Sequence, residues 1–69
     1  MSWLDLTTDF RTLAERVLTP KQLEAAMDEA DGLSLASAAL RHDVSVSTIR
    51  QQRREAHRRL RRALKEVAA

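Results

Sequence analysis

The chain has 69 residues, of which 43% are hydrophobic and 32% are charged. This balance fits one small domain and excludes both a second hydrophobic core and a fully disordered chain. The absence of cysteine excludes disulfide frameworks, thiol catalysis and cysteine-based zinc sites. No apolar run approaches the roughly 18 residues that span a membrane, and the first residues lack the features of a secretion signal, so we expect a cytoplasmic protein.

The net charge of +2 conceals two halves of opposite sign. Residues 1–32 contain seven acidic and three basic side chains, whereas residues 33–69 contain nine basic and three acidic ones. A basic half is typical of proteins that bind a polyanion, and the acidic half keeps the chain soluble. The alternative is that the basic run is simply a solvated helix face.

The composition predicts an all-α fold, and the spacing of apolar and capping residues predicts a small domain of four helices with a helix-turn-helix and a long C-terminal helix. The chain has one glycine, one proline and one phenylalanine, and it is rich in helix-forming residues. We expect residues 1–17 to form an N-terminal helix for packing or dimerisation and residues 18–69 to form the helix-turn-helix domain. The first helix is predicted from about Asp5 to Val17 because four apolar side chains recur there at helical spacing. These are Leu6, Phe10, Leu13 and Val17.

The second helix has the clearest start signal in the chain. Thr19 can cap its N-terminus, Pro20 suits the first helical position, and Gln22 can reach back to the cap. Gly32 is placed to end the helix in a left-handed conformation. The predicted inward face is Leu23, Ala26, Met27 and Ala30.

A short third helix is predicted from a Ser34 cap to about His42. Leu33 is expected to return to the core before this cap, and the predicted inward residues of the helix are Leu35, Ala38 and Ala39. Residues 41–44 form the expected turn, in which Asp43 tolerates a positive φ.

The last helix is predicted from Val46 to about Val67, with Ser45 as its cap. Its predicted inward seam is Ile49, Arg53, Ala56, Leu60, Leu64 and Val67. We expect the guanidinium of Arg53 to reach outward to solvent. At about 30 Å the helix is longer than the others can cover, so we expect its distal half to project or to pack on a second copy.

Two helices joined by a short turn, with bases on the second helix, match the geometry that places a helix in the major groove of DNA. Five residues near the start of the last helix lie on the side opposite Ile49, and we expect them to read bases. They are Val46, Ser47, Arg50, Gln51 and Arg54. Arginine pairs with guanine and glutamine with adenine. The expected contacts to the DNA backbone are Thr48, Arg53, Arg58 and Arg59.

Four runs of the sequence together resemble the helix-turn-helix domain of LuxR/FixJ-type response regulators (GerE-like), over about residues 18–60. The runs are Leu18-Thr19-Pro20, Gly32-Leu33-Ser34, Val44-Ser45 and Thr48-Ile49-Arg50. The continuation through Ala56, residues 58–62 and Leu64 is similar to region four of bacterial sigma factors. Both resemblances imply a DNA-reading helix, with Arg50, Gln51 and Arg54 at positions that commonly touch bases. The family's usual large aliphatic residues are replaced by Ala38 and His42, and we expect Leu40 to substitute for them.

Catalysis finds little support in the sequence. His42 and His57 lie on different predicted elements, with no carboxylate at metal-ligand spacing, so we expect neither an enzyme nor a metal or cofactor site. Asp28, Glu29 and Asp31 form an acidic cluster, which is either solvated surface or a docking patch for a basic partner such as a polymerase subunit.

We therefore predict a sequence-specific transcriptional regulator that binds double-stranded DNA. The alternative is a sigma-like interaction module that docks on RNA polymerase, a sigma factor or an anti-sigma partner through its acidic half. We expect a homodimer that forms through either the first helix or the distal seam of the last helix. A monomer would read a single DNA half-site, which gives little specificity within a genome.

Overall fold

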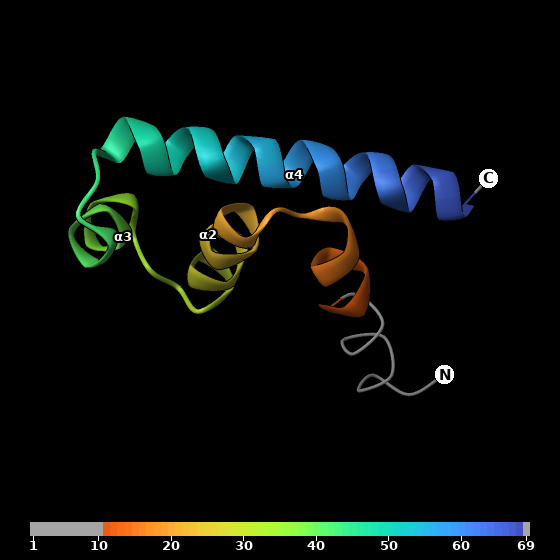
Figure 1. Ribbon diagram of the computed structural model, residues 1–69, viewed down its shortest axis with the longest axis horizontal. Coiled ribbons are helices and arrows are strands. Elements are labelled where there is room, and N and C mark those ends of the chain that lie inside the picture. The colour runs from red at the N-terminus through yellow and green to blue at the C-terminus, as the bar shows by residue number, and fades with distance from the viewer. Residues whose placement is uncertain (1–10, 69) are drawn as a thin grey trace.

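The computed structural model describes the backbone of residues 11–68 and the side chains of residues 11–66, and this part of the chain is all-α. A helical segment at residues 11–17 is followed by α2 (Pro20–Ala30), α3 (Leu35–His42) and α4 (Val46–Ala68). Figure 1 shows α4 running along one side of the molecule, with the other three helices arranged in succession beneath it. The predicted all-helical fold with a long C-terminal helix is confirmed. None of the helices in residues 11–68 has an apolar stretch that could cross a membrane.

Local hydrogen bonds fix both ends of α2 where the sequence predicts them. At its start Thr19 Oγ1 accepts from the backbone N–H of Gln22 at 3.2 Å, and Gln22 Oε1 accepts from the N–H of Thr19 at 3.2 Å. At its end Gly32 adopts a φ of +85°. The Leu33 N–H then donates to the carbonyl of Asp28 at 2.9 Å, which closes the helix.

The α3 and α4 caps likewise match the prediction. Ser34 Oγ accepts from the N–H of Ser37 at 3.1 Å, and Ser45 Oγ accepts from the N–H of Thr48 at 3.2 Å. Asp43 has a φ of 53° and ends α3. Because α3 continues to His42, the turn between the two helices is limited to residues 43–45.

The core consists of two apolar clusters that share α4. In the first, Ala14 and Leu18 pack against Ala56 and Leu60. In the second, α3 contributes Ala38 and Ala39, which pack against Ile49. Since α4 contributes to both clusters, its orientation is set by the N-terminal segment and α2 at one end and by α3 at the other.

The inward faces of the first two helices match the predicted ones only in part: Val17, Leu23 and Ala26 pack against the first cluster. Leu13 and Val17 are half-buried, while Ala14 and Leu18 are the buried positions of their segment. In α2 the predicted core residue Ala30 is exposed. The remaining predicted core residues of α2 are half-buried: Leu23, Ala26 and Met27. The buried positions of α2 are Ala25 and Asp28. Two residues of the predicted first stripe lie outside the described residues: Leu6 and Phe10.

The predicted seam of α4 holds only in its first part. Ile49, Ala56 and Leu60 are buried, but Leu64 is 44% exposed and Ala63 is buried instead. The prediction of a projecting distal half is wrong as far as Leu60, because Ala14 and Leu18 of the N-terminal segment pack against that residue. The side chain of Val67 lies outside the described residues.

The expected substitution by Leu40 is also wrong, because that side chain is 86% exposed. His42 instead turns inward and pairs with Asp28 of α2. A polar contact thus occupies the place of the aliphatic side chain expected at position 42, while Ala38 remains in the apolar core.

Candidate nucleic-acid interface

The five predicted base-reading residues lie together on the exposed side of the first turns of α4. All five are exposed, Val46 with 37% of its surface accessible. Four of them, together with Glu55, line one open groove of about 370 Å³. They are Ser47, Arg50, Gln51 and Arg54. The sequence prediction thus identified a group of side chains that the fold leaves free on a single face.

This exposure follows from how α4 packs against the rest of the domain. Ile49 is 1% exposed and Ala56 is 0% exposed, and Arg53 between them is also buried. With about 3.6 residues per turn, these three positions share one face of the helix. Positions 47, 50, 51 and 54 therefore lie outside this buried face and are exposed.

The electrostatics of this face favour an anionic partner. Among the described residues, Arg50 and Arg54 have no acidic partner. Glu55, the carboxylate beside them, pairs with Arg58. The first turn of α4 contains no acidic residue, so the positive end of the helix dipole is not neutralised there. The start of α4 is thus a surface on which a phosphate backbone would meet unpaired positive charge.

The predicted backbone-contacting residues have different surroundings. Thr48 is half-buried, and its hydroxyl is hydrogen-bonded to that of Ser45 at 2.9 Å. Arg58 and Arg59 are exposed, and Arg59 Nη1 donates to the carbonyl of Val17 at 3.4 Å.

Arg53 contradicts the prediction of an outward guanidinium. It is 8% exposed, and its Nη2 donates to the carbonyl of Leu33 at 2.8 Å. A guanidinium held this way inside the domain is not available to contact the backbone of a duplex. The sequence feature that indicated this burial was the position of Arg53 in the inward seam of α4, four residues after Ile49.

The sequence did not predict a polar contact between α2 and α3. Asp28 is 6% exposed and accepts from Nε2 of His42 at 2.6 Å, and Nη1 of Arg41 lies 3.5 Å from its other carboxylate oxygen. Glu29 pairs with His57 of α4. The predicted acidic cluster is therefore not a free docking patch, because two of its three carboxylates are engaged within the domain, and only Asp31 remains without a side-chain partner. The sequence feature that could have indicated this contact was His42, which stands at a position where an aliphatic residue was expected.

In the part of the chain that the structure describes, no three histidine, aspartate or glutamate side chains are close enough to hold a metal ion. The two histidines each face one carboxylate from a different helix. These pairs join helices to one another and form no nucleophile and base arrangement.

Comparisons of the chain with protein-family models, with curated proteins and with solved structures gave no match.

Proposed function

We propose that this protein is a sequence-specific double-stranded DNA-binding regulator that inserts the first turns of α4 into the major groove. The observation that supports this most directly is the exposure of Arg50, Gln51 and Arg54 on one face of a helix whose opposite face is buried. These side chains have the hydrogen-bonding groups that distinguish guanine and adenine in the major groove. The three-residue turn between α3 and α4 supports a helix-turn-helix arrangement.

The roles within the proposed interface follow from the surroundings of each side chain. Arg50 and Arg54 are free to form bidentate contacts with guanine, and Gln51 with adenine. Arg58 and Arg59 lie further along α4 and are suited to phosphate contacts, which set the register and give binding its salt dependence.

The test begins with selection of a preferred site from random-sequence duplexes, followed by binding measurements across a range of salt. We expect Arg54→Ala to weaken binding to the selected site by roughly 5- to 150-fold, since one bidentate base contact is worth about 1–3 kcal/mol. Arg62→Ala is the matched control: it removes the same charge from an 84% exposed side chain elsewhere on α4. We expect it to weaken binding by less than about threefold.

Two outcomes would overturn the proposal. One is a lack of retention on any duplex at low salt. The other is an equal effect of the two substitutions at the selected site, which would mean that α4 binds DNA only through charge.

The alternative remains a module that docks on RNA polymerase, a sigma factor or an anti-sigma partner. The engagement of Asp28 and Glu29 within the domain leaves its acidic half with less free charge than the sequence suggests. The feature that favours it is the 86% exposed side chain of Leu40 on α3. Regulatory activity that survives substitution of all three base-reading candidates, Arg50, Gln51 and Arg54, would support this alternative.

A further inference from the structure

An open cleft lined by arginine side chains lies beside α4, where that helix meets α2 and α3. Its volume is about 530 Å³, within the roughly 300–1,000 Å³ range of small-molecule sites. α2 contributes Glu29 and α3 contributes Leu35. The α4 residues are five arginines and one histidine: Arg50, Arg53, Arg54, His57, Arg58 and Arg61.

Positive charge in this cleft exceeds what the domain neutralises. Glu29 is the single carboxylate among the lining residues, and it pairs with His57. Of the five arginines, Arg58 pairs with Glu55 from outside the cleft. The other four have no acidic partner among the described residues. An anion that entered the cleft would meet unpaired guanidinium groups.

Arg53 gives an independent observation that points to an anionic ligand. It is more than nine-tenths buried, its Nη2 donates to the Leu33 carbonyl, and its Nε has no hydrogen-bond partner in the part of the chain described. A buried cation without a counterion is costly, because the surrounding groups replace only part of its lost hydration. An anion bound in the cleft, which Arg53 lines, would offset part of that cost through its charge.

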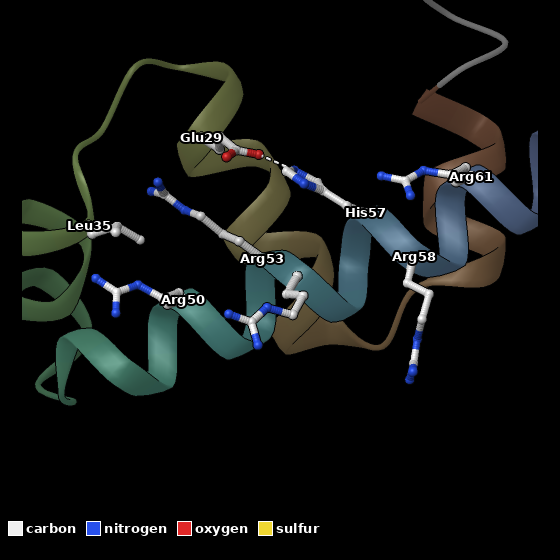
Figure 2. A pocket seen from close by; sticks show the side chains of 8 residues that line it. Glu29, Leu35, Arg50, Arg53, His57, Arg58 and Arg61 are labelled. Atoms are coloured by element: carbon white, nitrogen blue, oxygen red, sulfur yellow. Dashed lines mark hydrogen bonds and ion pairs between the residues drawn. The ribbon is translucent and has the colours of Figure 1, made fainter.

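Figure 2 shows how the labelled side chains are arranged. Arg50 and Arg53 extend toward Leu35 of α3, and Arg61 extends toward His57, which faces Glu29. Arg58 points away from these groups (Figure 2). The cationic groups that face the cleft thus come from successive turns along one side of α4.

We propose that this cleft binds a condensed phosphate, that is, two or three linked phosphoryl groups, either free or as the phosphate chain of a nucleotide. Linked phosphoryl groups place several negative charges within a few ångströms, which suits several guanidinium groups on adjacent helical turns. Leu35 is the only apolar side chain among the lining residues, so the phosphate chain supplies most of the affinity and a nucleobase adds little.

A small anion fits this site better than the backbone of a duplex does. A duplex is a stiff cylinder whose phosphates meet protruding side chains, whereas Arg53 is held beneath the surface by Leu33. The inference does not rest on DNA binding. If the protein also binds DNA, the two ligands share residues, because Arg50 and Arg54 line both the cleft and the groove proposed to face DNA. Condensed phosphate and DNA should therefore compete.

The test is calorimetric titration of the full chain with sodium tripolyphosphate at fixed ionic strength, without DNA. Two neighbouring arginines give a matched pair: Arg61 lines the cleft, and Arg62 does not. We expect Arg61→Gln to weaken binding roughly tenfold, as for loss of a charge-assisted hydrogen bond. Arg62→Gln, with the same loss of charge, should change it by less than about twofold. Equal effects of the two substitutions would overturn the proposal.

A gain-of-affinity variant tests the same site from the opposite direction. Glu29→Gln removes the one carboxylate of the cleft, and we expect roughly threefold tighter binding of tripolyphosphate because a like charge is removed. An unchanged or weaker affinity in a folded variant would count against the site. In a nitrogen-15 spectrum of the unaltered chain, the Arg53 Nε–H signal should shift on titration, and a stationary signal would also count against it.

Titrations with three further ligands identify the source of the phosphate. A nucleoside triphosphate should bind about as tightly as tripolyphosphate, the corresponding nucleoside should not bind, and orthophosphate should bind much more weakly. Orthophosphate binding as tightly as tripolyphosphate would overturn the proposal. A chain that binds a selected duplex but no tripolyphosphate refutes the cleft alone, whereas the reverse result refutes DNA binding alone.

Discussion

At the scale of single residues, Asp28 has a structural role that the sequence alone does not reveal. Its carboxylate is buried between α2 and α3 and is satisfied by His42 and Arg41. A buried carboxylate in such a position depends on its partners, and those partners depend on it. The relative orientation of α2 and α3, and through it the support of α4, therefore involves a polar contact in place of an aliphatic one.

We predict that Asp28→Ala lowers the free energy of unfolding by about 3 kcal/mol, because it leaves the inward-facing His42 without its partner. Urea denaturation followed by circular dichroism measures this change. Asp31→Ala removes a carboxylate three residues away whose side chain is exposed, and it should alter stability by less than about 0.5 kcal/mol. Similar losses for both variants would show that Asp28 acts only through general charge.

At the scale of elements, the ends of the helices are set by short-range hydrogen bonds. The capping pair of Thr19 and Gln22 and the caps at Ser34 and Ser45 each join groups three residues apart. Such contacts need no tertiary partner, so their residue types and spacing were sufficient to predict where α2, α3 and α4 begin.

The C-terminus of α2 allows a test of backbone conformation alone. Gly32 has a φ of +85°, and a Cβ added there would meet no atom within 4 Å. We predict that Gly32→Ala costs about 1–2 kcal/mol through the left-handed backbone rather than through a clash. Gly32→Asn should cost less, because asparagine tolerates this conformation. Thermal unfolding of the two variants distinguishes them, and a larger loss for Gly32→Asn would indicate that side-chain volume matters.

At the scale of the whole molecule, the long α4 organises two clusters and leaves Leu64 partly uncovered. Its side chain is 44% exposed, on the part of α4 where the sequence predicts a seam for self-association. A two-fold dimer through this region would place two α4 helices to read two half-sites, as regulators with a helix-turn-helix commonly do.

We expect the chain to sediment as a dimer at high concentration and Leu64→Glu to sediment as a monomer without loss of stability, since the side chain is already partly in solvent. Leu40→Glu introduces the same charge at an 86% exposed position on α3 and should leave the dimer intact. A monomer for the unaltered chain at all concentrations, with and without DNA, would contradict the expectation of self-association.

The sequence by itself determined the helical class, the caps and the exposed face that includes Arg50, Gln51 and Arg54. Capping depends on residues three positions apart, and the face depends on the helical repeat, so both are local properties of the chain. Only the tertiary structure decided the burial of Arg53 and Asp28, since their partners lie 20 and 14 residues away. It also decided that Ala63 rather than Leu64 is buried, because a spacing pattern does not show which neighbouring helix covers which position of α4.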